Sequence, residues 1–241
     1  MAKTLIVPGL FGSGEGHWQR YWLADYPAAA MVEQQDWNHP RLARWQGALE
    51  AEILRYETVD LVAHSLGSVL VAALADRPVA TRVRSALLVA PCDLDETERL
   101  HPGAIDFGPM PNRPLPFRSL VVGSLNDPYM PFARLKSLCE KWGSSLVDLG
   151  HAGHINVASG YGRWTHGYNL LRVLEAIADL KPHPPAAGKN TDSLAVVEAG
   201  SGLTQAHLFS NRTEGVTPSA PASRLSTRTF AGIPRKSSSP R

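Results

Sequence analysis

The sequence has few cysteines and no long apolar run, and each scarcity excludes a class of protein. Its 241 residues include two cysteines, Cys92 and Cys139, which are too few for a disulfide scaffold, so we expect reduced thiols that pack rather than bridge. The longest apolar stretch, residues 69–75, is far short of the roughly 20 residues that a membrane-spanning helix needs. Residues 3–8 are too short for the apolar core of a signal peptide. We therefore expect a cytoplasmic protein that has no membrane partner.

Aromatic residues are almost absent from the last part of the chain. Of the 18 aromatic residues, 16 precede residue 181, whereas 35 of the 60 residues in 182–241 are Ser, Thr, Pro, Gly or Ala. A segment of this composition cannot bury enough apolar surface to offset the chain entropy lost on folding. We expect one folded domain in residues 1–181 and a disordered tail in residues 182–241.

The tail is basic, although the domain before it is not. Residues 181–241 hold eight Lys or Arg against three Asp or Glu. A basic tail is one feature of proteins that bind nucleic acid or an acidic membrane face. Here the cations are scattered, apart from Arg235 and Lys236, and no aromatic platform accompanies them. We therefore favour a solvated appendage and expect no nucleic-acid partner.

The apolar runs of residues 1–181 are short and lack polar alternation, which is typical of buried parallel strands. We predict six strands, in residues 5–7, 30–33, 59–63, 86–90, 120–122 and 146–149. Helical spacing relates Leu42, Trp45, Leu49 and Ile53, with Asn38 as a plausible N-cap and Pro40 in the first turn. We predict further helices in residues 18–25, 66–75, 132–142 and 167–180. This alternation predicts an α/β protein with a mostly parallel sheet of about six strands and helices on both faces.

The most informative segment is an apolar strand that turns within one residue into an apolar helix, with Ser65 on the turn. A serine at such a junction presents its hydroxyl above the sheet edge, beside the amide of Leu66. Gly67 lets the two backbones approach each other, but Ala63 replaces the usual first glycine of the G-x-S-x-G pattern. Because a serine after a strand is often only a helix cap, its partners must decide between the two interpretations.

A nucleophilic serine needs a histidine to accept its proton and a carboxylate to orient that histidine. Asp127 follows a predicted strand, and Pro128 disfavours helical geometry at Asp127. His154 lies in a glycine-flanked loop after the last predicted strand. Ser65, Asp127 and His154 therefore leave three parallel strands at the same sheet edge, in the chain order of α/β-hydrolases. We predict that these three residues are catalytic.

A glycine-rich loop follows the first predicted strand and can supply backbone N–H groups near Ser65. We expect the amide of Leu10, or with less support that of Phe11, to join the amide of Leu66 as an oxyanion hole.

These features resemble a known family, the small α/β-hydrolase serine hydrolases grouped with retinoblastoma-binding protein 9 and bacterial YdeN-type proteins. The resemblance covers residues 4 to about 180 and rests on Val7-Pro-Gly, Gly16-His-Trp-Gln, Asp36-Trp37, Ala63-His-Ser-Leu-Gly-Ser68, Asn126-Asp-Pro128, Gly153-His-Ile-Asn156 and Ser159-Gly-Tyr-Gly-Arg-Trp164. It implies a compact α/β-hydrolase fold with Ser65, Asp127 and His154 as the triad and no metal. The tail has no counterpart in this pattern.

Several residues allow a different interpretation of the site. Asp93 and Asp95 compete with Asp127 as the acid, whereas we expect His64 to be a core or supporting residue. His151 and His154 have an H-x-x-H spacing, but no third ligand accompanies them, so we expect no metal.

We also expect no cofactor. Gly12, Gly14 and Gly16 resemble a dinucleotide loop, but His17 occupies the place of the third glycine, where close helix packing requires no side chain.

Residues 92–117 are rich in Pro and Gly and are predicted to form a small cap over the site. We expect an apolar pocket that involves Trp18, Phe107, Met110, Phe117 and Tyr129.

The sequence therefore favours a carboxylesterase-like serine hydrolase acting on a small-molecule ester or, with less support, an amide, through an acyl-enzyme on Ser65. The alternative is a non-catalytic protein of the same fold that binds a partner. Removal of the residues after Lys181 is expected to leave melting temperature and turnover nearly unchanged.

Overall fold

The chain forms a parallel β-sheet in a computed structural model, which describes residues 2–180 and 196–198. The strand order is β2-β1-β3-β4-β5-β6-β7, and every neighbouring pair is parallel. The strands span β1 Lys3–Val7, β2 Ala29–Met31, β3 Val59–His64, β4 Val83–Val89, β5 Arg118–Gly123, β6 Ser145–Asp148 and β7 Val196–Glu198. The predicted α/β architecture, with a mostly parallel sheet and helices on both faces, is confirmed.

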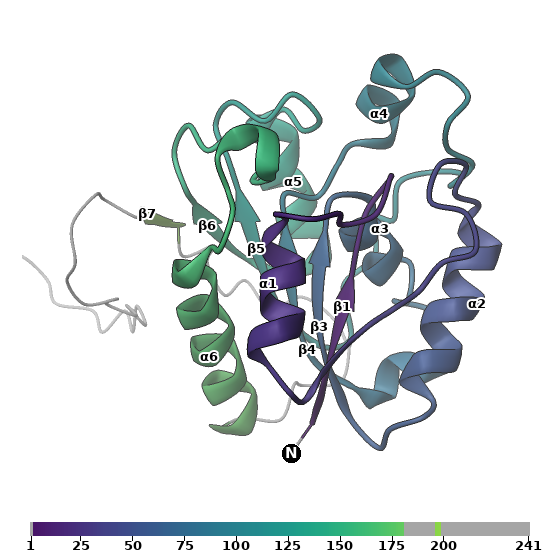
Figure 1. Cartoon of the computed structure of the whole chain (residues 1–241), viewed down its shortest axis with the longest axis vertical. Helices are drawn as coiled ribbons and strands as arrows, with labels where there is room; N and C mark the ends of the chain where they lie inside the picture. The colour runs from purple at the N-terminus through teal and green to yellow at the C-terminus, as the bar shows by residue number, and fades with distance from the viewer. Residues whose placement is uncertain (1, 181–195, 199–241) are drawn as a thin grey trace, which may run out of the picture. The chain divides into compact units, whose positions relative to one another are not determined.

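Helices cover both faces of the sheet because successive strand residues point to opposite sides and both sides are apolar. The helical elements are α1 Trp18–Asp25, α2 Leu42–Ile53, α3 Leu66–Ala72, η1 Pro78–Arg82, α4 Leu94–Leu100, α5 Phe132–Trp142, η2 Val157–Ser159 and α6 Thr165–Leu180. On β1, Ile6 packs in the cluster that α1 and α6 cover, whereas Leu5 and Val7 pack in the cluster covered by α2, α3 and α5. In Figure 1, α1 and α6 lie in front of the sheet and α3 and α5 lie behind it.

The helix boundaries differ from the sequence expectations at three places. Arg41, not Asn38, is the N-cap of α2, and Asn38 lies in a turn before the helix, where its amide donates to Asp36 Oδ1. The α3 helix ends at Ala72, and α6 begins at Thr165.

The predicted cap region contains a short helix, α4, that the sequence analysis did not predict. Asp93 is its N-cap and accepts hydrogen bonds from the amides of Asp95 and Glu96. Acidic residues in the first turn and Arg99 in the last turn complement the helix dipole. This segment therefore forms a helix through its termini rather than through an extended apolar face.

The sheet gains one strand beyond the predicted domain. Val196–Glu198 pairs in parallel with β6, with Leu146 opposite Val196. The expectation of a structureless tail did not include this strand. The rest of residues 182–241 lies outside the described residues, so their predicted disorder stays a prediction.

Candidate active site

Ser65 occupies the turn between β3, which ends at His64, and α3, which begins at Leu66. Its backbone has φ 54° and ψ −124°, a conformation that costs a non-glycine residue about 1–3 kcal/mol. The Ser65 amide donates to the carbonyl oxygen of Val89 on β4 at 3.0 Å, which fastens the turn to the sheet. The surrounding structure therefore holds the serine in a strained geometry at the end of its strand.

Two glycines allow the loop after β1 to lie against this turn. A Cβ atom on Gly67 would lie 2.4 Å from the carbonyl oxygen of Val7, and one on Gly9 would lie 2.8 Å from Cβ of Ser65. Both distances are shorter than side-chain carbons tolerate, so only glycine fits without a backbone shift. The prediction that Gly67 lets the two backbones approach each other therefore holds. Gly9, on the loop after β1, is needed for the same close approach.

Ser65, His154 and Asp127 form a continuous chain of hydrogen-bonding groups. The distance between Ser65 Oγ and His154 Nε2 is 2.8 Å, and His154 Nδ1 lies 2.9 Å from each carboxylate oxygen of Asp127. All three residues are buried, so little water competes for these contacts. Because Asp127 is an acceptor when ionised, His154 donates from Nδ1 and can accept the serine proton at Nε2.

The loops that carry Asp127 and His154 are joined by hydrogen bonds. Asn126 Oδ1 accepts from the Gly153 amide at 2.8 Å, and Ser124 Oγ accepts from the Ala152 amide at 2.9 Å. On the far side of His154, its own amide donates to Ser159 Oγ at 3.0 Å. His154 is therefore held by its backbone as well as by its ring.

His64 contacts the backbone of His154. The His64 Nε2 atom lies 3.0 Å from the His154 carbonyl oxygen, which can only accept, so Nε2 carries the proton. Burial, together with His154 and His17, lowers the pKa of His64 well below its ordinary value and keeps the ring neutral.

Two backbone amides close to Ser65 in the fold have no hydrogen-bond partner among the described residues. These belong to Leu10 and Leu66; the latter begins α3, where no preceding helical carbonyl is available. The Phe11 amide, the less favoured alternative, donates to the carbonyl oxygen of Trp37 at 2.8 Å. Phe11 is therefore not available as an anion-binding donor.

The competing carboxylates are engaged elsewhere. Asp93 is buried, caps α4 and pairs with Arg134, whereas the exposed side chain of Asp95 pairs with the same arginine. Neither contacts His154. The described residues contain no cluster of three or more His, Cys, Asp or Glu side chains suited to a metal ion, and His151 is exposed.

A pocket of about 220 Å³ opens onto Ser65. Its lining residues come from loops at the carboxyl edge of the sheet and from α4: Leu10, Phe11, Gly12, His17, His64, Ser65, Thr97, His101, Tyr129, His154 and Asn156. The expected apolar lining was largely wrong, since of the five residues named only Tyr129 takes part. Trp18, Phe107 and Phe117 are buried in the two cores, and Met110 packs against one of them. The pocket is thus of mixed polarity, with four histidines beside the apolar side chains of Leu10 and Phe11.

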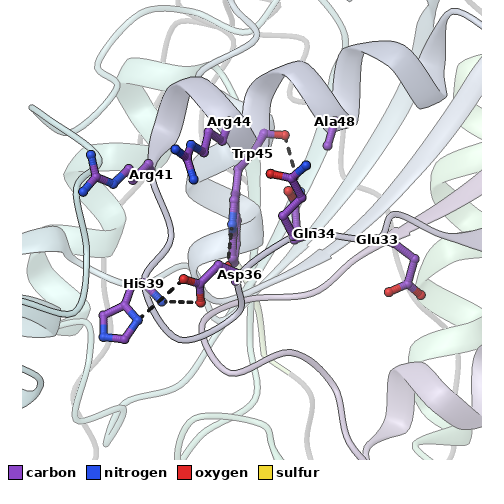
Figure 2. Close-up of a pocket in the computed structure, with 9 residues that line it drawn as sticks. Glu33, Gln34, Asp36, His39, Arg41, Arg44, Trp45 and Ala48 are labelled. Atoms are coloured by element: carbon purple, nitrogen blue, oxygen red, sulfur yellow. Dashed lines mark hydrogen bonds and ion pairs between the residues drawn. The ribbon is translucent and has the colours of Figure 1, made fainter.

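A second pocket, of about 290 Å³, lies at the start of α2 and shares no lining residue with the Ser65 pocket (Figure 2). Its polar groups mostly bond to one another. Asp36 Oδ1 accepts from the amide of His39, Trp45 Nε1 donates to the Asp36 carbonyl oxygen, and Gln34 donates to the Trp45 carbonyl oxygen. Arg41 and Arg44 are exposed side chains on its edge. This pocket holds no nucleophile beside a base.

Comparisons with known proteins place this geometry in context. Residues 4–173 match the model of a family described as serine hydrolase. A structure of a putative YdeN-like hydrolase from Pectobacterium atrosepticum is 31% identical over 74% of this chain and 92% of the other, with a TM-score of 0.65. The ydeN gene product of B. subtilis is 19% identical over 73% of this chain and 100% of the other, with a TM-score of 0.56.

A more distant structure shares the fold. Esterase 2 of Thermogutta terrifontis is 15% identical over 76% of this chain and 85% of the other, with a TM-score of 0.52. No curated protein matches this chain. In the described part of the chain, no helix combines the length and the apolar composition needed to cross a bilayer.

Proposed function

Because the chain belongs to the small serine hydrolases of YdeN type, we propose that it cleaves a small carboxylic ester, or with less support an amide, through an acyl-enzyme on Ser65. The observation that carries this proposal is the contact of Ser65 Oγ with His154 Nε2, whose ring is held on its other side by Asp127.

In the proposed reaction, Ser65 Oγ attacks the substrate carbonyl carbon while His154 Nε2 takes the hydroxyl proton. The Asp127 carboxylate stabilises the resulting imidazolium. The amides of Leu10 and Leu66 donate to the oxyanion, a contribution of about 3 kcal/mol per donor in comparable sites. The carbon–oxygen bond to the alcohol then breaks, and the alcohol leaves with the proton from His154. Water, deprotonated by the same nitrogen, releases the acid from Ser65.

The size of the pocket limits the substrate. A volume of about 220 Å³ is below the roughly 300–1,000 Å³ of sites that enclose drug-sized ligands. We therefore propose a short acyl group, with the alcohol or amine portion outside the pocket.

An alkyl fluorophosphonate probe tests the nucleophile. The expected result is covalent labelling of the wild-type protein at Ser65 and loss of labelling in Ser65→Ala, with the matched control Ser68→Ala still labelled. Ser68 is a buried serine on α3, three residues after Ser65, and its hydroxyl donates to the Val89 carbonyl oxygen at 3.4 Å, so it controls for the loss of a buried hydroxyl.

His154 offers a second matched pair. Labelling should become weak in His154→Ala but persist in His151→Ala, because His151 is an exposed residue of the same loop. A folded wild-type protein that resists the probe would contradict the proposal and favour a non-catalytic binding protein. Initial rates on p-nitrophenyl esters and aminoacyl amides then distinguish the two bond types.

A further inference from the structure

His17 lies at the start of α1, in the loop segment that leads from β1, and its buried ring lines the Ser65 pocket. The ring is 4.9 Å from that of His64, centroid to centroid, and His64 in turn is 5.0 Å from His154. The mechanism above gives His17 no task. Its surroundings nevertheless fix which of its two nitrogens carries a proton.

The Nδ1 atom of His17 is an acceptor. It caps α1 by accepting from the amide of Gln19 at 3.2 Å, so it carries no proton. Burial, and to a lesser extent the nearby His154, lowers the pKa of His17 to about 4, so the ring is neutral at pH 7. A neutral imidazole with an accepting Nδ1 is protonated at Nε2.

This Nε2–H group has no acceptor among residues 2–180 and 196–198, and it is not among their fully enclosed unpartnered atoms. The other three histidines of the pocket are engaged. His64 Nε2 donates to the His154 carbonyl oxygen, His101 Nε2 bonds to the Tyr129 hydroxyl, and His154 bonds at both nitrogens. His17 thus presents an unused donor to a pocket that has no carboxylate, lysine or arginine in its lining.

We propose that His17 Nε2–H donates a hydrogen bond to an oxygen atom in the acyl group of the substrate. The pocket then favours short acyl chains that carry an ether, hydroxyl or carbonyl oxygen over hydrocarbon chains of the same length. This proposal rests on the proposed function, because it describes the acyl group that Ser65 receives. It makes His17 a specificity-determining residue.

Two isosteric esters measure this preference: p-nitrophenyl methoxyacetate and p-nitrophenyl butyrate, which differ by one ether oxygen in place of a methylene group. The quantity of interest is the ratio of their kcat/KM values in each variant relative to wild type. The different intrinsic reactivities of the two esters cancel in this comparison. One neutral hydrogen bond corresponds to about a fivefold change in the ratio.

Two substitutions separate the two nitrogens of His17. In His17→Asn, the side-chain oxygen can replace Nδ1 as the helix cap, but no donor reaches the position of Nε2. In His17→Gln, the amide nitrogen reaches that position, but the cap is weakened. We expect the ratio to fall about fivefold in His17→Asn, mainly through KM for the methoxyacetate, and to be largely restored in His17→Gln despite a lower melting temperature.

A ratio in His17→Asn within twofold of wild type, or an equal loss in both variants that follows melting temperature, would overturn the proposal. Nitrogen-15 NMR of the wild-type protein tests its premise without any substrate. His17 should keep an unprotonated Nδ1 and a protonated Nε2 from pH 7 down to about pH 5, and a charged ring at pH 6 would also overturn the proposal. Failure of the proposed function is recognised separately, as absence of fluorophosphonate labelling at Ser65.

Discussion

Replacing His17 by Asn should make the folded protein less sensitive to acid. The pKa of His17 is about 4 in the folded protein and 6.5 in an unfolded chain, because folding buries the ring and, to a lesser extent, places it near His154. As the pH falls below 6.5, His17 therefore binds a proton in the unfolded chain but stays neutral in the folded protein until the pH approaches 4. The stability associated with the neutral ring is present above pH 6.5 and is lost as the pH falls toward 4.

The magnitude follows from the size of the shift. The difference between the two pKa values of His17 lowers the free energy of unfolding by about 3 kcal/mol once the pH is at or below 4, at 1.36 kcal/mol for each pKa unit. Between pH 7 and pH 5 the wild-type protein loses about 2 kcal/mol of this contribution. His64, whose pKa is also lowered, adds a loss of the same sign. These values are a large part of the 5–15 kcal/mol that stabilises a typical domain.

Urea unfolding at pH 7, 6 and 5, followed by tryptophan fluorescence, measures this dependence. The free energy of unfolding of His17→Asn should fall by about 2 kcal/mol less than that of wild type between pH 7 and pH 5. His151→Asn is the matched control, because it makes the same substitution at an exposed histidine. Parallel losses in wild type and His17→Asn would refute the argument that His17 is buried and neutral.

Three further predictions concern the site and the sheet. Asp127→Asn should lower ester turnover by at least about 10³-fold, whereas Asp93→Asn should lower melting temperature with little effect on turnover; the reverse pattern in initial-rate assays would make Asp93 the acid. Gly67→Ala should lower both melting temperature and kcat/KM, because its Cβ would clash with the backbone of Val7 and Pro8. Gly47→Ala, with open space around it on α2, should raise melting temperature slightly. Equal effects of the two substitutions would show that the backbone after β1 shifts at little cost in free energy. Deletion of residues 182–241 should leave kcat/KM within twofold, because every described site residue precedes residue 181, and a larger loss would place part of the site in the tail.

The sequence was sufficient for the first six strands of the sheet because parallel strands covered on both faces are apolar along most of their length, as residues 61–63 of β3 and 86–89 of β4 are. It was also sufficient to select Ser65, Asp127 and His154 as neighbours, since each follows a different strand that ends at the same sheet edge. This inference needed only the parallel direction of the strands and no knowledge of side-chain directions.

Features that depend on side-chain direction could not be predicted in the same way. Phe107 and Phe117 are as apolar as a pocket wall requires, yet both turn into the core, where Phe107 packs edge-on against Trp45. The short helix α4 lacks an extended apolar face, and its first turn is stabilised by the Asp93 cap. A search for apolar periodicity does not detect such a helix. His17 gave no signal beyond its place in Gly16-His-Trp-Gln, because its role depends on rings brought together by folding.

The hydrogen bonds that join Asn126 to Gly153 and Ser124 to Ala152 have a consequence for protein engineering. Hydrogen bonds connect the loop that carries Asp127, after β5, to the loop that carries His154, after the adjacent strand β6, whereas Ser65 lies in the turn after β3. Exchanging residues 124–127 for a loop of another protein without also exchanging residues 150–159 would break these hydrogen bonds and remove the support of His154. Exchanging both segments together preserves the hydrogen bonds. Variants of the acyl pocket are therefore better sought in α4 and in the loop after β1.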